Sequence, residues 1–276
     1  MGDTLRLGRM RHQVGARTLV MGILNVTPDS FSDGGLHDTI DAAVDHALVM
    51  LAEGADIIDI GGESTRPGAT EVAAPDEAAR VVPVVERLAG MVDQPISIDT
   101  YKAAVADAAL RAGATIVNDV WGLQRDPAMA ATVALHEASL IIMHNRAEAD
   151  AGLDMLDEVK AFFDRSLDLA HAAGIAEDRI VLDPGIGFGK TLEQNVELVA
   201  RLDELKAIGF PILIGVSRKS MIGRILDRPV EERLYGTIAA NVLSIVAGAD
   251  IVRVHDVAAH VDACRITEAV MRRRNG

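Results

Sequence analysis

One short pattern occurs three times in the chain and constrains its fold. The stretches EGADIIDI, AGATIVND and AGADIVRV each place the end of a helical pattern, a Gly-Ala pair and one polar residue directly before an apolar run. The glycines at these junctions, Gly54, Gly113 and Gly248, suit the left-handed conformation that often ends a helix. A repeated helix-to-strand turn indicates a repeated βα unit.

The same alternation extends over most of the chain. Continuous apolar runs, typical of parallel strands covered on both faces, lie at 18–25, 55–61, 95–100, 114–120, 139–144, 179–184, 211–217 and 250–255. Helical patterns lie at 38–54, 75–92, 102–112, 127–138, 154–173, 191–208, 234–248 and 259–273. Eight strands and eight helices in 276 residues predict an α/β fold, the TIM (β/α)8 barrel.

A doubly wound open sheet is the competing fold. It usually shows a glycine-rich turn between its first strand and first helix, and the corresponding part of this sequence has none. We find no linker or low-complexity segment, so we expect a single domain over residues 1–276. Residues 3–17 precede the first barrel strand, and we expect them to form a short hairpin that closes the barrel floor.

Composition narrows the class of partner. The formal net charge of −14 argues against nucleic acid or an anionic membrane as the main ligand, so an anionic substrate needs a local cluster of cations. The single cysteine, Cys264, excludes an internal disulfide and fits a reducing compartment. We see no apolar signal core at the N-terminus and no membrane-length apolar run, so we expect a cytoplasmic protein.

Every predicted strand ends in a polar or charged residue. Active sites of TIM barrels lie at the carboxyl ends of the strands, so these side chains should meet in one mouth. In chain order they are Asn25, Asp59, Asp99, Asn118 with Asp119, His144, Asp183, Ser217 to Lys219, and Arg253 with His255. Any one of them alone is most simply a loop or capping residue, but eight together predict a binding site.

One part of this set, together with Arg66 from the GGESTRPG stretch that follows Asp59, is cationic or binds metal ions. Arg66, Lys219, Arg253 and His255 supply the charges that phosphate oxygens prefer. Asn25 can offer its carbonyl oxygen to a Mg²⁺ ion held by a polyphosphate. These residues together predict a diphosphate pocket.

Another part is rich in acceptors. Asp99, Asn118 and Asp183 suit a flat heterocycle with several N–H donors, because buried carboxylates need donors or a cation such as Lys219. Capping of a following helix is the alternative for Asp99 and Asp183. The glycine-rich DPGIGFGKT is not a P-loop, because Pro184 stands where that motif needs glycine. We expect Lys102 and Arg111 on solvated helix faces.

Seven motifs in order resemble one family. GILNVTPDSFSDGG, DIGGESTRPGA, SIDT, IVND, LDPGIGFGKT, GVSRKS and RVHDV together resemble the dihydropteroate synthases of folate biosynthesis, over nearly the whole chain. The resemblance implies a TIM-barrel transferase, usually a homodimer. Such enzymes join 6-hydroxymethyl-7,8-dihydropterin diphosphate to p-aminobenzoate with Mg²⁺ and release pyrophosphate. Sulfonamides mimic p-aminobenzoate in this family, so we expect competitive inhibition.

The resemblance also implies roles for individual residues. The pterin ring would be held by Asp99, Asn118, Asp183 and Lys219, with Arg253 stacked on it and facing the diphosphate. The diphosphate and Mg²⁺ would be held by Asn25, Arg66 and His255. The p-aminobenzoate site would be lined by Thr65, Pro67, Phe188 and Ser217, with Thr27, Pro28 and Asp29 on a mobile first loop. Asp29, Arg66, Lys219, Arg253 and His255 form the expected catalytic set, and Met143 and Gly215 join the substrate-binding set.

Three further expectations concern neighbouring residues and other functions. Arg218, between Ser217 and Lys219, should point away from the site into an ion pair. Trp121 should pack beside the pterin pocket or cover it. A pterin-dependent methyltransferase and a non-catalytic pterin-binding paralogue are the alternatives to the synthase, and the diphosphate cations Arg66 and His255 argue against the methyltransferase.

Overall fold

The computed structural model describes residues 4–27, 36–64 and 70–274, and its centre is a parallel β-barrel. Its strands are β3 (Leu19–Asn25), β4 (Ile57–Gly61), β5 (Ile96–Asp99), β6 (Ile116–Asp119), β7 (Ser139–Met143), β8 (Ile180–Asp183), β9 (Leu213–Ile214) and β10 (Ile251–Val254). They pair in the order β8-β7-β6-β5-β4-β3-β10-β9, and a parallel bridge between Leu182 and Ile212 joins the two edges. The predicted TIM barrel is confirmed, and the open sheet is excluded.

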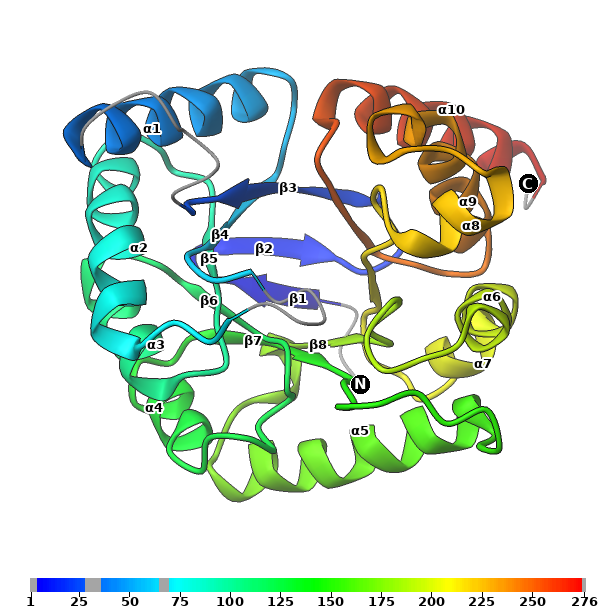
Figure 1. Cartoon of the computed structure of the whole chain (residues 1–276), viewed down its shortest axis with the longest axis horizontal. Helices are drawn as coiled ribbons and strands as arrows, with labels where there is room; N and C mark the ends of the chain where they lie inside the picture. The colour runs from blue at the N-terminus through cyan, green and yellow to red at the C-terminus, as the bar shows by residue number, and fades with distance from the viewer. Residues whose placement is uncertain (1–3, 28–35, 65–69, 275–276) are drawn as a thin grey trace.

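Helices form a ring outside the strands (Figure 1). They are α1 (Leu36–Ala52), α2 (Ala74–Ala89), α3 (Ala103–Ala112), α4 (Met129–Leu135), α5 (Met155–Ala172), α6 (Leu192–Ala200), α7 (Leu202–Lys206), α8 (Ser220–Leu226), α9 (Leu234–Val246) and α10 (Val257–Arg274), with 3-10 turns at Glu177–Arg179 and Val230–Glu232. All eight predicted strands and a helix in every predicted interval are present. The boundaries differ by a few residues.

Two details of the helices differ from the sequence prediction. The helix expected over 191–208 is broken at Arg201, whose backbone leaves the helical region at φ −114° and ψ 28°. Helix α8 was not predicted. It has seven residues with Gly223 among them, too few for a recognisable apolar period.

The hairpin expected at the barrel floor is present. Strands β1 (Thr4–Leu7) and β2 (Met10–Gln13) pair in antiparallel register and lie across the barrel in Figure 1. Leu5 and Leu7 belong to one buried cluster with residues of the barrel strands. These are Leu19, Met21, Ile57, Ile116, Ile141, Val181, Leu213 and Ile251. The hairpin therefore closes the floor and leaves the other end, where the polar strand tips lie, for a ligand.

The repeated junction has the expected geometry. Gly54, Gly113 and Gly248 have φ of 105°, 118° and 106°. At Gly113 an added Cβ would lie 2.4 Å from the Cβ of Ala89, so helix packing as well as the backbone conformation requires glycine. Within the described residues, we find no helix with the length and apolar character of a membrane span.

The hairpin gives a stability prediction. Leu7→Ala removes a side chain with no exposed surface from the floor cluster, so we expect the free energy of unfolding to fall by about 2–5 kcal/mol. Urea denaturation measures this loss. Leu135→Ala on α4, where the leucine is 73% exposed, is the matched control and should change stability by less than about 0.5 kcal/mol. An equal small effect at both positions would contradict a packed floor.

Candidate active site

The centre of the barrel mouth is organised by Arg253. Its Nε donates to Oδ2 of Asp59 at 2.6 Å, and its Nη2 donates to Oδ2 of Asp99 at 2.6 Å. Asp59 Oδ2 also accepts from Nδ2 of Asn118 at 3.1 Å. The network therefore links the carboxyl ends of β10, β4, β5 and β6, and it orients four side chains toward one point.

Several acceptors in this network lack a donor. Within the part of the chain that the structure describes, Oδ1 of Asp59, Asp99 and Asn118 are buried and have no hydrogen-bond partner. Unmatched buried acceptors are costly, so native proteins rarely collect them without a ligand or water to supply donors. The cluster is therefore suited to a planar ligand that presents several N–H groups.

Asp183 and Lys219 lie next to this cluster. A Cβ placed on Gly215 would lie 3.7 Å from Lys219 Nζ, 3.9 Å from Asp183 Oδ2 and 4.0 Å from Arg253 Cβ, so the three side chains surround one small space. Lys219 Nζ donates to the carbonyl of Ile186 at 2.5 Å and lies 4.7 Å from the centre of the Phe188 ring. Ammonium, carboxylate and aromatic ring thus meet at one edge of the cluster.

The charges of the site depend on burial and on each other. Burial raises the pKa of Asp99 to about 7, although the Arg253 guanidinium lowers this pKa by favouring the ionised form. Burial also raises the pKa of Asp183, opposed by Lys219. The pKa of Lys219 falls to about 8 because burial outweighs the attraction of Asp183. Burial lowers the pKa of Arg253, but Asp59 and Asp99 outweigh it and raise the value, so Arg253 stays charged.

The loop after β8 is held by backbone constraints. Asp183 Oδ1 accepts from the Gly185 amide at 2.8 Å within the turn after β8. The helix-capping alternative is wrong for this residue, because Thr191 caps the next helix, α6. Gly185 has φ 66°, and a Cβ there would lie 1.9 Å from the His144 carbonyl oxygen. Buried Lys190 donates to the carbonyls of Gly185 and Phe188 at 2.8 and 3.0 Å. These contacts place Phe188 and the Ile186 carbonyl beside Lys219.

The two residues before Lys219 in the chain have different partners. Arg218 forms a two-point ion pair with Asp256, at 3.0 and 2.5 Å, so its predicted orientation away from the site is confirmed. Ser217 is turned toward His255. Its Oγ lies 2.9 Å from His255 Nδ1 and accepts from the His255 amide at 3.2 Å. Ser217 therefore fixes the orientation of the imidazole ring.

Comparisons with known proteins agree with this geometry. The family profile described as "Pterin binding enzyme" matches residues 21–255. A dihydropteroate synthase of Clostridium beijerinckii is 47% identical over 98% of this chain and 100% of its own length. That of Bacillus subtilis is 50% identical over 92% of this chain and 89% of its own length. The chain belongs to the dihydropteroate synthase family.

Solved structures of this family share the fold over its full length. The Clostridium difficile dihydropteroate synthase, crystallised in the presence of pteroic acid, has a TM-score of 0.92 and 52% identity and covers 95% of this chain and 99% of its own. The Xanthomonas albilineans enzyme with 4-aminobenzoic acid has a TM-score of 0.93 and 45% identity, and the match covers 98% of this chain and 99% of its own. A Yersinia pestis synthase complexed with a sulfonamide drug has a TM-score of 0.91 and 43% identity, and the match covers 98% of this chain and 99% of its own. These likenesses do not favour the methyltransferase alternative.

The remaining family positions lie around the mouth. Asn25 ends β3 with an exposed side chain. Met143 packs with Tyr101 and Val120, and Trp121 and Phe188 pack against this group. Because Phe188 also contacts Lys219, the group adjoins the site. Trp121 therefore packs beside the site, which is the first of the two positions expected for it. The predicted residues Pro28, Asp29, Thr65, Arg66 and Pro67 lie outside the described residues.

Other residues at or near the strand ends shape loops or pack in the core. Asp119 accepts from the amides of Trp121 and Leu123 at 2.9 and 2.7 Å, which shapes the β6–α4 loop. His144 is fully buried edge-on against Phe162, and burial lowers its pKa to about 2. For Asp99 the helix-capping alternative is wrong, because Asp126 accepts from the first amide of α3 at 2.8 Å.

Two sequence-based interpretations change. Asp59 was predicted to lie at the mouth but was given no role there, although it accepts from both Arg253 and Asn118; its position before GGEST at the tip of a buried strand was the available signal. Lys102 was expected on a solvated helix face, and this is wrong. It is 9% exposed and pairs with Glu63 and Glu77, because it precedes α3 and turns inward. Arg111 does lie on the surface.

The Arg253 network yields a pH-dependent prediction. Arg253→Met leaves two buried carboxylates without a cation, so the free energy of unfolding should fall by about 3–5 kcal/mol near neutral pH. A carboxyl whose folded pKa lies above its unfolded value stabilises the fold at low pH and loses that contribution as pH rises toward the folded pKa. The variant should therefore lose stability more steeply than the parent between about pH 5 and about pH 8.

Urea denaturation at several pH values measures this slope. Arg224→Met, which removes an exposed arginine, is the control and should follow the parent at every pH. A variant that is destabilised equally at all pH values would contradict the role of Arg253 as the counter-ion of buried carboxylates.

Proposed function

We propose that this chain is a transferase that joins 6-hydroxymethyl-7,8-dihydropterin diphosphate to p-aminobenzoate, releasing pyrophosphate and forming 7,8-dihydropteroate. The observation that carries the proposal is the set of buried, unmatched acceptors on Asp59, Asp99 and Asn118 beside the Asp183–Lys219 pair. A pterin ring presents several N–H donors along one edge and acceptors on another, which is the complement of this set. Membership of the synthase family supports the same substrate.

Binding of the pterin follows from these groups. The free oxygens of Asp99 and Asn118 would accept from ring N–H groups, and Asp183 would add a further acceptor beside Lys219. Lys219 would donate to a ring acceptor while it faces Asp183 and Phe188. Arg253 uses Nε and Nη2 for the two aspartates, and its planar face is suited to stacking on the ring.

The diphosphate would lie where cations adjoin the pterin cluster. Arg253 lies in β10 and His255 directly follows this strand, and Ser217 orients the histidine. Arg66 would add a second guanidinium. Asn25 fits a Mg²⁺ ion shared with the substrate, because its exposed amide oxygen is a hard ligand and such ions keep most of their other ligands as water and phosphate. When bound, the ion would neutralise part of the diphosphate charge.

The reaction breaks the bond between the pterin methylene carbon and the diphosphate oxygen, whose electron pair leaves with the pyrophosphate. Arg253, Arg66 and His255 would stabilise the negative charge that grows on this oxygen. The electron-rich pterin stabilises the positive carbon, which the amine of p-aminobenzoate attacks before losing a proton to solvent. Phe188 and Ser217, with Thr65 and Pro67, would line the amine site. Asp29 on the first loop would help exclude water from the reacting carbon.

A direct test combines binding and turnover. Titration calorimetry with pterin diphosphate and Mg²⁺ should give tight binding to the parent, and Asp183→Ala should weaken it at least about 100-fold, since a buried charged partner is lost. Addition of p-aminobenzoate should release pyrophosphate. EDTA should suppress this release, and a sulfonamide should raise the KM for p-aminobenzoate without changing kcat.

Each outcome decides a separate part of the proposal. Binding without pyrophosphate release would establish the non-catalytic paralogue instead. Unchanged turnover in EDTA would exclude the proposed Mg²⁺ requirement. Binding that Asp183→Ala does not affect would contradict the assigned pterin pocket.

We also propose that the chain forms a homodimer through helices α8, α9 and α10 and works in the cytoplasm. Large exposed apolar side chains are concentrated on these neighbouring helices. They are Ile225, Leu226, Tyr235, Leu243, Val246, Ile266 and Val270. Exposed apolar patches of this kind favour a protein partner, and a second copy supplies a matching apolar surface.

The proposed cytoplasmic location rests on the cysteine content. The single, buried Cys264 suits a reducing compartment.

The dimer surface can be tested by charge. Leu243→Lys combined with Ile266→Lys places two cations on the proposed interface, so the dimer should dissociate to monomers in sedimentation velocity. Leu135→Lys, at an exposed leucine on α4, is the control and should remain dimeric. A monomeric parent, or a double variant that stays dimeric, would contradict the proposal.

A further inference from the structure

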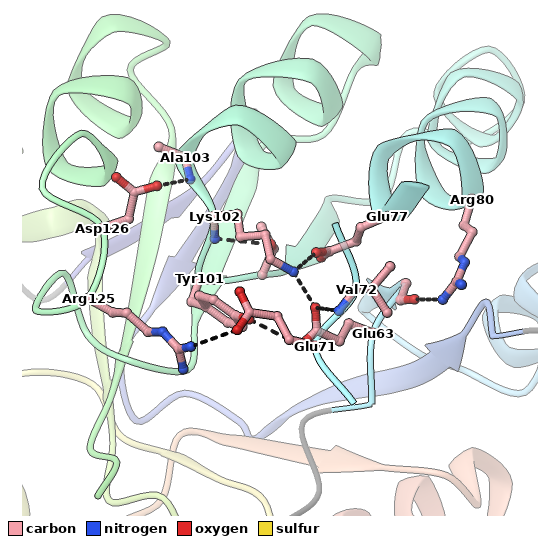
Figure 2. A network of polar contacts seen from close by, with 12 residues as sticks. Glu63, Glu71, Val72, Glu77, Arg80, Tyr101, Lys102, Ala103, Arg125 and Asp126 are labelled. Atoms are coloured by element: carbon pink, nitrogen blue, oxygen red, sulfur yellow. Dashed lines mark hydrogen bonds and ion pairs between the residues drawn. The ribbon is translucent and has the colours of Figure 1, made fainter. Parts of the chain in front are cut away.

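Glu63 accepts hydrogen bonds from three residues in two separate segments at the outer side of the mouth. It lies two residues after β4, at the start of the connection to α2. Its Oε2 accepts from the Val72 amide at 3.2 Å and its Oε1 accepts from the Tyr101 hydroxyl at 3.1 Å. Lys102 donates to Oε2 as well. Because Val72 is at the far end of the same connection, Glu63 joins the two described ends of 62–73 (Figure 2).

Lys102 fixes this junction to the helix layer. Its Nζ also donates to Glu77 Oε2 at 2.6 Å, in the first turn of α2, and lies 4.7 Å from the centre of the Tyr101 ring. Both Lys102 and Glu77 are buried. Burial lowers the pKa of Lys102, but Glu63 and Glu77 outweigh it and raise the value, so the lysine stays charged. A buried cation between two carboxylates has few alternative positions.

Two arginines support the same connection from outside. Arg80 donates to the carbonyl of Gly62 at 2.8 Å, at the start of the connection. Arg125 pairs with Glu71 at 3.3 Å, near its end, and lies 4.2 and 5.1 Å from the Tyr101 and Trp121 rings (Figure 2). Beside them is an open hollow of about 610 Å³ lined by residues 71–74, 101, 102 and 125–127. The contacts therefore hold the ends of the connection, while the hollow leaves its outer side uncovered.

We infer that Glu63 and Lys102 are positioning residues for the transfer reaction. Neither side chain is assigned to a substrate. They hold the two described ends of the 62–73 connection against Tyr101 and α2, and Thr65, Arg66 and Pro67 lie between these ends in the sequence. Fixed ends favour correct placement of the groups that engage the aryl amine and the diphosphate. The inference rests on the proposed function, because it acts through the roles proposed for those three residues.

A structural role alone would give a different result. Loss of a buried ion pair lowers stability wherever it lies, but it raises the KM for one substrate only if the pair positions that substrate's site. The chain offers a matched pair for this comparison. Lys206 donates to buried Asp250 at 2.5 Å, beside the amino end of β10 and so at the opposite end of the barrel from the mouth.

The experiment compares Lys102→Met with Lys206→Met, and adds Glu63→Gln as a nearly isosteric variant in case the first does not fold. We expect Lys102→Met and Glu63→Gln to raise the KM for p-aminobenzoate about tenfold, which corresponds to about 1.4 kcal/mol, and to lower kcat. Binding of the free pterin 6-hydroxymethylpterin, measured by calorimetry, should stay within about twofold of the parent. Lys102→Arg keeps the cation, so its KM for p-aminobenzoate should stay close to that of the parent.

Lys206→Met should lower the thermal midpoint without changing either KM. An unchanged KM for p-aminobenzoate in both Lys102→Met and Glu63→Gln, or an equal rise in Lys206→Met, would overturn the inference. These results differ from failure of the proposed function, in which the parent itself would bind no pterin and release no pyrophosphate.

Discussion

The buried ion network of Arg253 with Asp59 and Asp99 is the interaction on which the rest of the site depends. A guanidinium and two carboxyl groups from three strands occupy the barrel centre, where each alone would be costly, and two 2.6 Å hydrogen bonds from the guanidinium make the arrangement stable. Because Arg253 engages one oxygen of each carboxylate, the other oxygens are left for a ligand. The same contacts that stabilise the folded mouth thus define its binding chemistry.

This arrangement explains how a chain with a net charge of −14 is suited to a diphosphate substrate. The cations that matter are held by local partners: Arg253 by two aspartates, and Lys219 beside Asp183 and under Phe188. Such pairing fixes the positions of the cations more tightly than an excess of positive charge would. It also confines the attraction for anions to the mouth, within about a Debye length.

Around the inner site lies a second set of contacts that shapes the loops. Lys190 binds two carbonyls of the β8–α6 loop, Asp119 binds two amides of the β6–α4 loop, and Glu63 joins both ends of the β4–α2 connection. Asp119 and Glu63 lie at or shortly after strand ends and Lys190 lies just before α6, but the partners of all three are mainly backbone groups or other loops. Strand-end polarity in this barrel therefore serves both ligand binding and loop placement, and the partner decides which.

The sequence by itself determined the barrel, its eight strands, the floor hairpin and the group of polar side chains at the mouth. Local patterns were sufficient for these, because continuous apolar runs and glycine-ended helices report burial and turn geometry directly. The motif resemblance named Asp99, Asn118, Asp183, Lys219 and Arg253, and the structure brings all five together. Only the tertiary structure decided which carboxylate meets which cation.

Asp59 and Lys102 show why. Asp59 is separated from Arg253 by 194 positions, and Lys102 reaches Glu63 and Glu77 across 39 and 25 positions. No local period records such pairings, because they arise when strands far apart in sequence become neighbours in the closed barrel. A lysine at the start of an amphipathic helix has the same sequence appearance whether it faces water or two buried glutamates, and the packing of α2 against α3 makes that choice.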